Sequence, residues 1–180
     1  MQRRKLLRPI LIVPGYGDSG PGHWQTLFET KLPGAERVRM PSFDAPDPTG
    51  WVAELDRAIA AAPAPPVLVA HSLGCIAVAR WSAAHRRPVH GALLVAPADV
   101  EKSALPAPVR AFAPIPSEAL PFPSILVAST NDPYLELVRA QSLASSWEAF
   151  LQVVPDGGHL NVESGHGSWL DGELLLGELL

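Results

Sequence analysis

The sequence predicts an α/β fold: a parallel sheet of about six strands with helices packed on both faces. Two observations support this prediction. Short apolar runs of strand length alternate along the chain with longer segments in which apolar residues recur at helical spacing. The strand-length runs are followed by turns rich in glycine, proline or small polar residues. Such alternation is typical of a sheet covered on both sides, and 180 residues suit one domain spanning residues 1–180.

The predicted strands are apolar enough to be buried on both faces, except for one polar strand that we place at a sheet edge. In chain order they cover residues 10–13, 37–40, 67–70, 92–96, 125–128 and 150–154, and 37–40 is the polar strand. Helices are predicted from residue 21, over 51–62, from 73 to 81, over 109–112, from 135 to 147, and after residue 167, where the last helix carries Leu170, Leu174 and Leu175.

Charge and cysteine content argue against several classes of partner. The formal net charge is −4 and no long basic run occurs, which disfavours binding to nucleic acid or to an anionic membrane surface. Cys75 is the only cysteine, so an internal disulfide is impossible and a reducing compartment is expected. The basic residues 3–5 followed by apolar residues imitate a signal peptide, but Arg8 and Pro9 interrupt the apolar run. No run is long enough to span a bilayer, and we expect a cytoplasmic protein.

The stretch 67–75 predicts a buried strand that turns sharply into a helix, with Ser72 on the turn. Ala70 and Gly74 are small, as in the G-x-S-x-G motif, where small residues let the backbone bend without clashes. Such a turn raises the serine hydroxyl above the sheet edge and aims the amide of Leu73 into the same space. Acyl transfer needs this pairing of a nucleophile with a donor for the developing oxyanion. For this stretch alone, a serine that only caps the helix is the alternative.

A glycine-rich turn, residues 14–20, follows the first predicted strand. It contains neither the phosphate-binding motif G-x-x-x-x-G-K-[ST] nor G-x-G-x-x-G. Glycines in this position let the backbone approach a substrate, and the amide of Tyr16, directly after Gly15, is the expected second oxyanion donor. A flexible connection is the alternative interpretation of this segment.

A serine hydroxyl needs a base within hydrogen-bond reach and a third group that orients the base. Ser72, Asp132 and His159 each follow a predicted strand, in the order serine, acid, histidine. We therefore expect His159 to accept the proton of Ser72, and Asp132 to hold the tautomer of the imidazole. Asp99 also follows a strand and is the alternative acid.

The other histidines fit the role of the base less well. His71 flanks the serine and is expected to point away along the turn, whereas His23 opens the first helix and is a candidate for the pocket mouth. His85, His90 and His166 have no matching position after a strand. No group of histidines and carboxylates has the spacing of a zinc site, so neither a metal nor a cofactor is expected.

The proline-rich segment 97–123 is too short and too rich in proline for a helical lid, and we expect an ordered loop along one side of the site. Phe112 and Ile115 are candidates for the lip of the pocket. Cys75, on the helix after the serine, is expected to be a buried packing residue instead of a second nucleophile.

Four ordered blocks of sequence resemble one known family. They are Val13–Gln25, Val69–Cys75, Asn131–Tyr134 and Gly158–Asn161, and they are similar to those of the small α/β-hydrolases grouped with the retinoblastoma-binding serine hydrolase. The resemblance covers nearly the whole chain. It implies a minimal, lidless α/β-hydrolase with strand order 2-1-3-4-5-6, the triad placed as above, and esterase activity on small acyl substrates. The L-x-C-x-E segment of the eukaryotic member does not carry over, because Leu73–Ala77 lacks the glutamate.

Our leading hypothesis is a serine hydrolase that cleaves small-molecule carboxylic esters, or less favourably amides, through an acyl-enzyme on Ser72. The second hypothesis is a non-catalytic interaction module, a protein of another functional class that keeps the fold and binds a partner through segment 97–123. An intact nucleophile, acid and base favour the enzyme, since a binding module needs none of them.

Overall fold

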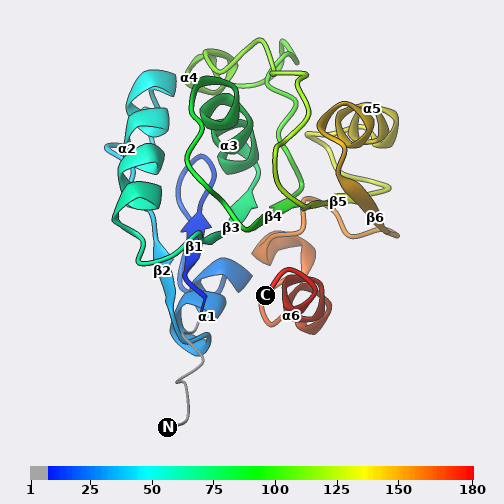
Figure 1. Cartoon of the computed structure of the whole chain (residues 1–180). Coiled ribbons are helices and arrows are strands. Elements are labelled where there is room, and N and C mark those ends of the chain that lie inside the picture. The colour runs from blue at the N-terminus through cyan, green and yellow to red at the C-terminus, as the bar shows by residue number, and fades with distance from the viewer. Residues whose placement is uncertain (1–7) are drawn as a thin grey trace, which may run out of the picture.

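The computed structural model describes residues 8–180 and has the predicted architecture, a parallel sheet between two layers of helices (Figure 1). The six strands follow the predicted order β2-β1-β3-β4-β5-β6, and every neighbouring pair is parallel. The basic residues 3–5 lie outside the described part of the chain. The strands are β1 (Ile10–Val13), β2 (Ala35–Arg37), β3 (Val67–His71), β4 (Gly91–Val95), β5 (Ser124–Ser129) and β6 (Phe150–Val154).

The helices cover the sheet in two layers. They are α1 (Trp24–Lys31), α2 (Pro48–Ala61), α3 (Leu73–Ala84), α4 (Ala107–Arg110), α5 (Leu137–Trp147) and α6 (Leu170–Gly177), with a 3₁₀ turn η1 (Val162–Ser164). Helices α2, α3 and α5 lie on one face of the sheet, and α1 and α6 lie on the other (Figure 1). Within segment 97–123 the helical structure is the single turn of α4, so this segment is a loop and not a lid.

Alternation along each strand decides which helical layer a side chain enters. In β3, Leu68 and Ala70 are buried against α2, α3 and α5, whereas Val67 and Val69 are buried against α1 and α6. A parallel strand covered on both faces therefore needs a continuous apolar run. Full burial of an aliphatic side chain such as Leu68 contributes roughly 1.5–3 kcal/mol relative to leaving it exposed, which holds the helices to the sheet.

The edge strand β2 covers Ala35–Arg37 instead of the predicted 37–40. Its last paired residue lies opposite Ile12, and beyond it the Val38 amide makes one more bond to the Ile12 carbonyl oxygen (2.9 Å). Strand β1 ends one residue later. Because β1 ends at Val13, it offers no strand for residues 39 and 40 to pair with, and the apolar residues of 37–40 continue as a loop.

Of the three leucines singled out above in the C-terminal helix, only Leu175 packs against the core, and it is partly buried. Leu170 and Leu174 are 65% and 63% exposed, whereas Leu176 is buried. Trp169, just before the helix, is also buried, and a Cβ atom on Gly172 would lie within 2.2 Å of its ring. The absence of a side chain at this glycine lets the tryptophan fold under the first turn of α6.

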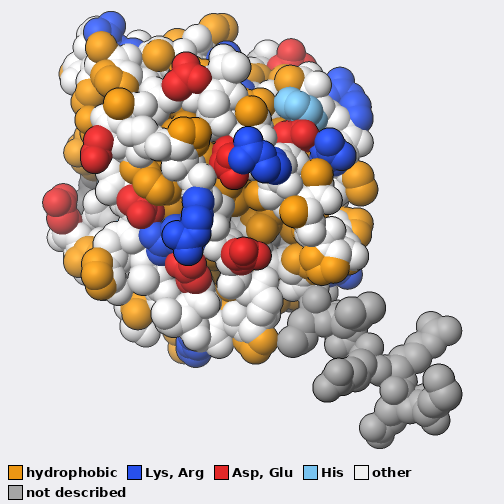
Figure 2. All heavy atoms as spheres, turned by 90° about the vertical axis from the view of Figure 1, so that its left-hand side faces the viewer, with side chains coloured by type: hydrophobic (Ala, Val, Ile, Leu, Met, Phe, Trp, Pro, Cys, Tyr) orange, Lys and Arg blue, Asp and Glu red, His pale blue; other side chains and the backbone are white. Residues whose placement is uncertain are grey.

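The face formed by α2 and β2 carries mixed charge, with basic and acidic side chains next to one another (Figure 2). Residues of β2 and α2 form ion pairs: Arg37 of β2 with Asp18 and Glu29, Arg57 of α2 with Glu54, and Asp56 of α2 with Arg87. This face therefore differs from the continuous basic patch that typically binds nucleic acid.

Two further features bear on partners. Among residues 8–180, no helix has the length and apolar composition needed to cross a membrane. The same residues contain no group of three or more histidine, cysteine, aspartate or glutamate side chains placed to hold a metal ion.

Candidate active site

The turn between β3 and α3 has a strained geometry. Ser72 has φ 54° and ψ −121°, a conformation that residues other than glycine rarely adopt. Its side chain makes no capping hydrogen bond to α3, so the capping interpretation does not describe it. Two glycines make the turn possible. A Cβ atom on Gly74 would lie 2.3 Å from the Val13 carbonyl oxygen, and one on Gly15 would lie 2.9 Å from the Ser72 Cβ.

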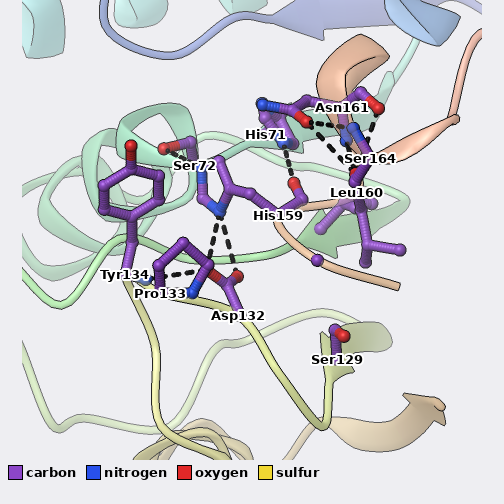
Figure 3. Close-up of polar contacts among 12 residues, drawn as sticks. His71, Ser72, Ser129, Asp132, Pro133, Tyr134, His159, Leu160, Asn161 and Ser164 are labelled. Atoms are coloured by element: carbon purple, nitrogen blue, oxygen red, sulfur yellow. Dashed lines mark hydrogen bonds and ion pairs between the residues drawn. The ribbon is translucent and has the colours of Figure 1, made fainter. Parts of the chain in front are cut away.

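The Ser72 hydroxyl, the His159 ring and the Asp132 carboxylate are joined by hydrogen bonds (Figure 3). Ser72 Oγ lies 2.9 Å from His159 Nε2, and His159 Nδ1 lies 3.0 and 2.9 Å from the two carboxylate oxygens of Asp132. Because a carboxylate only accepts, Nδ1 carries the ring proton and Nε2 accepts from the hydroxyl. The Asp132 side chain is fully buried, so water does not compete for its bonds to His159.

Neighbouring contacts fix the loops that carry the acid and the histidine. Asp132 accepts the amide of Tyr134 (2.8 Å), and the Tyr134 ring packs edge-on against the His159 ring with 4.6 Å between centroids. The side-chain oxygen of Asn131 accepts the amide of Gly158 (2.7 Å), which ties the two loops together. These loops leave the neighbouring strands β5 and β6 at their carboxyl ends, where the side chains meet.

Asp99, the alternative acid, lies in a different network. Its carboxylate is 3.7 Å from Arg139 Nε, and Arg139 also pairs with Glu101 at 2.7 Å. Both carboxylate contacts of His159 Nδ1 come from Asp132. The geometry therefore places Asp132 beside the imidazole, and Asp99 at the root of the loop that follows β4.

Two backbone amides beside Ser72 have no hydrogen-bond acceptor in the described chain, those of Tyr16 and Leu73. Leu73 is the first residue of α3, where N–H groups lack an acceptor within the helix. Gly15 brings the other loop close, since a Cβ atom there would lie 3.4 Å from the Leu73 nitrogen. Free amides at a helix N-terminus favour negative charge, so this region can hold an oxyanion.

The loop that carries Tyr16 is anchored on both sides, and so it is ordered. Arg37, at the end of β2, donates to Asp18 (2.7 Å) and to the Ser19 carbonyl oxygen (2.9 Å). Gln25, fully buried in α1, accepts the Ser19 hydroxyl (2.6 Å) and donates to carbonyl oxygens in β1 and β3 at 3.2 and 3.0 Å. These bonds hold the glycine-rich turn against the strand that carries the serine.

The expectation that His71 points away from the site is wrong. Its Nε2 donates to the His159 carbonyl oxygen (2.9 Å), and the two rings lie 4.9 Å apart. Burial, reinforced by the neighbouring His159 and His23, holds the pKa of His71 well below its ordinary value. The missed signal is the strand period. His71 shares a face with Val67 and Val69, and that face is covered by α1 and by the chain after β6.

His23 lies on the wall of the cavity over Ser72, with its ring 4.8 Å from that of His71. It is the N-cap residue of α1, and its Nδ1 accepts the amide of Gln25 (3.1 Å). Burial, followed by the charge of Arg37, lowers the pKa of His23 to about 4, so the ring is neutral at pH 7. The single ring proton is therefore on Nε2.

The cavity over Ser72 has a volume of about 320 Å³ and is lined by both apolar and polar side chains. The apolar lining comes from the proline-rich segment and consists of Ala98, Leu105, Pro106 and Val109. The polar lining includes Asp18, His23, Asn161 and Glu163. Tyr16 and Tyr134 also line it, and both are more than 40% exposed.

The predicted lip residues are wrong, although the segment that contains them does border the site. Phe112 is fully buried against Trp51, with 5.5 Å between ring centroids. Ile115 lines a separate, more open cavity of about 750 Å³ between α2, α3 and residues 114–118. Because α4 ends at residue 110, the chain beyond it turns into the α2 and α3 layer and leaves Val109 facing the site.

Cys75 is a packing residue, as predicted. Its side chain is fully buried, and Sγ donates to the Val95 carbonyl oxygen at 3.4 Å. Burial raises the pKa of the thiol well above its ordinary value, so the reactive thiolate does not form at neutral pH.

A family model described as serine hydrolase matches residues 10–178. Among solved structures, a YdeN-like hydrolase from Pectobacterium atrosepticum is 31% identical, with a TM-score of 0.84 over 95% of this chain and 89% of that chain. The ydeN gene product of B. subtilis is 22% identical, with a TM-score of 0.78 over 96% and 98% of the two chains. A hydrolase of the alpha/beta superfamily from Xanthomonas campestris is 24% identical, with a TM-score of 0.67 over 94% and 99%. These last two likenesses concern the fold alone. A search of curated proteins found no match.

Proposed function

Because the chain belongs to the serine hydrolase family and has the α/β-hydrolase fold, we propose that it is a carboxylesterase that cleaves small esters through an acyl-enzyme on Ser72. The observation that carries this proposal is the hydrogen-bonded series from Ser72 Oγ through His159 to Asp132, with 2.9–3.0 Å between heavy atoms. A hydroxyl is a poor nucleophile at neutral pH unless a base takes its proton, and this series supplies the base and its orienting acid.

In the first half of the reaction, Ser72 Oγ attacks the ester carbonyl carbon while its proton passes to His159 Nε2. The carbonyl oxygen becomes an oxyanion, and the amides of Tyr16 and Leu73 are the donors that we expect to stabilise it. The tetrahedral intermediate collapses when the C–O bond to the alcohol breaks and His159 returns the proton to the alcohol oxygen. Asp132 stabilises the imidazolium throughout, and the acyl group stays on Ser72.

In the second half, a water molecule takes the place of the alcohol. His159 Nε2 accepts a proton from the water as its oxygen attacks the acyl carbon, and the same two amides hold the second oxyanion. When the bond to Ser72 Oγ breaks, His159 gives the proton back to the serine, and the carboxylic acid leaves.

The cavity limits the size of the substrate. Water occupies about 30 Å³ per molecule in the liquid, so 320 Å³ holds on the order of ten non-hydrogen atoms. The cavity is bordered by loops without a lid domain, and Leu105 and Val109 present an apolar surface to the substrate. Short acyl esters fit these limits better than long-chain lipids.

A non-catalytic interaction module is the competing proposal, with segment 97–123 as its binding surface. Leu105, Pro106 and Val109 of that segment lie over Ser72, which is the position expected for the wall of a substrate pocket. The same experiment tests both proposals.

The experiment is a kinetic comparison on p-nitrophenyl esters from acetate to octanoate. Ser72→Ala and His159→Ala should each lower kcat by roughly 10⁴- to 10⁶-fold, and the double variant should be little worse, because residues that act as one unit are not additive. His90→Ala is the matched control, since His90 is exposed and lies outside the cavity. Full activity in Ser72→Ala would contradict the mechanism. A folded wild type that cleaves none of the esters would favour the interaction module.

A further inference from the structure

His23 presents a hydrogen-bond donor that the proposed reaction does not use. Its Nδ1 accepts the amide of Gln25, so the neutral ring donates through Nε2. This Nε2 has no partner among residues 8–180, whereas the ring donor of the adjacent Trp24 is bonded to the Leu160 carbonyl oxygen (2.8 Å). His23 Nε2 is not fully enclosed. Among residues 8–180, the unpartnered side-chain nitrogen and oxygen atoms that are fully enclosed are Arg8 Nε and Asp99 Oδ1. Since His23 lines the cavity over Ser72, its free donor is open to a ligand there.

Asn161 presents a second free donor in the lining of the same cavity. Its side-chain oxygen accepts both the amide and the hydroxyl of Ser164, each at 3.1 Å, and this capping arrangement fixes the orientation of the amide group (Figure 3). The Nδ2 group is therefore on the other side of the side chain, and it has no acceptor in the described part of the chain. Asn161 also lines the cavity.

These donors are side-chain groups and are distinct from the backbone pair that faces the oxyanion. The amides of Tyr16 and Leu73 belong to the loop after β1 and to the start of α3, whereas His23 is the N-cap residue of α1 and Asn161 belongs to the chain after β6. The cavity also has an apolar lining, from Leu105, Pro106 and Val109. A substrate that fills this space therefore combines an apolar part with hydrogen-bond acceptors.

We propose that His23 and Asn161 form a donor subsite that binds a neutral carbonyl or amide oxygen of the substrate other than the carbonyl oxygen of the ester that is cleaved. The acceptor is neutral, because Glu163 lines the same cavity, has no ion-pair partner among residues 8–180 and repels a carboxylate, whereas the charge of Asp18 is paired with Arg37. The substrate class is thus a small ester with a second, uncharged carbonyl group. This inference rests on the proposed esterase function.

The test compares matched esters that differ in this one group. For the acyl part, the pair is p-nitrophenyl 4-oxopentanoate and p-nitrophenyl pentanoate. For the alcohol part, it is 2-acetamidoethyl butanoate and pentyl butanoate. In each pair, the ratio of the two kcat/KM values is measured for wild type and variants, so that differences in intrinsic reactivity cancel.

The variants keep the local caps. Asn161→Asp retains the oxygen that accepts from Ser164 but removes the Nδ2 donor, and His23→Asn retains a capping oxygen for the start of α1 but removes the ring donor. Asn131→Asp is the matched control. Its oxygen likewise accepts a backbone amide, that of Gly158, and it lies outside the cavity.

In one of the two ester pairs, Asn161→Asp and His23→Asn should each lower the preference for the carbonyl-bearing ester by about three- to tenfold, the usual net effect of one hydrogen bond. Asn131→Asp should leave the preference within about twofold of wild type, whatever its effect on the rate. Unchanged preferences in both pairs, with the plain esters still cleaved, would overturn the subsite alone. If the wild type cleaves no ester in a reaction that depends on Ser72, both the subsite and the proposed function fall.

Discussion

Replacement of Gly74 by alanine tests whether the close approach of α3 to β1 shapes the site. An alanine Cβ atom at this position would lie 2.3 Å from the Val13 carbonyl oxygen and 2.6 Å from that of Pro14. Real Cβ atoms essentially never come closer than 3.0 Å to such an atom, so the start of α3 and the end of β1 must separate by about 0.7 Å. Both contacts are with backbone, and no side-chain rotation can relieve them.

The magnitude follows from two opposing effects. Overpacking of this kind costs roughly 1–3 kcal/mol, and the higher helix propensity of alanine returns at most about 1 kcal/mol. We therefore expect Gly74→Ala to lower the free energy of unfolding by about 1–2 kcal/mol. The same displacement moves Ser72 and Leu73 away from the Tyr16 amide. A misplacement of about 1 Å can cost 10²-fold in rate, so kcat should fall by roughly 10- to 100-fold.

Urea unfolding and the hydrolysis of p-nitrophenyl butanoate measure the two effects. Gly177→Ala, at the end of α6, makes the same chemical change where a Cβ atom would meet nothing within 4 Å, and it should leave stability and kcat unchanged or raise stability slightly. A Gly74→Ala protein with the unfolding midpoint and kcat of wild type would refute the reasoning.

Three further predictions concern single side chains. Asp132→Asn should lower kcat by about 10³- to 10⁴-fold, because an amide has no charge to stabilise the imidazolium. Asp99→Asn should lower kcat less than about tenfold. If steady-state kinetics show a larger loss in Asp99→Asn than in Asp132→Asn, the acid is Asp99. Cys75 should resist iodoacetamide in the native protein and react completely in denaturant, as measured by intact mass, and rapid native labelling would show that the thiol is accessible. The pKa of His23 is about 4 in the folded protein, compared with the ordinary value of 6.5. Between pH 4 and pH 6.5 the unfolded chain therefore binds more protons than the folded protein. The free energy of unfolding rises with pH over this range, by about 3 kcal/mol in total. Urea unfolding from pH 4 to 7 should therefore show a smaller pH dependence in His23→Asn than in wild type, and equal slopes would contradict this assignment.

Much of the fold could be predicted because the relevant patterns are local. Apolar runs of strand length and helical spacing are visible within a dozen residues, and their alternation implies a parallel sheet. Parallel strands also place their carboxyl ends at one edge. For this reason, three residues far apart in the chain, Ser72, Asp132 and His159, could be grouped before any coordinates were known.

The direction of single side chains could not be predicted in the same way. Phe112 and Val109 are both buried in the core, yet only Val109 also lines the cavity over Ser72, because α4 ends between them and no local pattern marks that end. The acid could not be chosen from strand position alone, because Asp99 and Asp132 both follow a strand. Tertiary contacts separate them, since Asp132 is bonded to His159 and Asp99 lies beside Arg139. The alternation of β3 indicates which face of the sheet His71 occupies. Its direction toward the site could be predicted only with the position of the helix that covers this face as well.

The central claim is that the Ser72 hydroxyl is a nucleophile activated by His159. Labelling with a fluorophosphonate, followed by peptide mass spectrometry, tests it most directly, since the reagent forms a covalent bond only with an activated hydroxyl. We expect a single phosphonyl adduct on Ser72, no adduct in Ser72→Ala, and labelling slowed by at least about 10²-fold in His159→Ala, because a general base contributes at least that factor. An adduct on another residue, or labelling of Ser72 at an unchanged rate in His159→Ala, would contradict the mechanism.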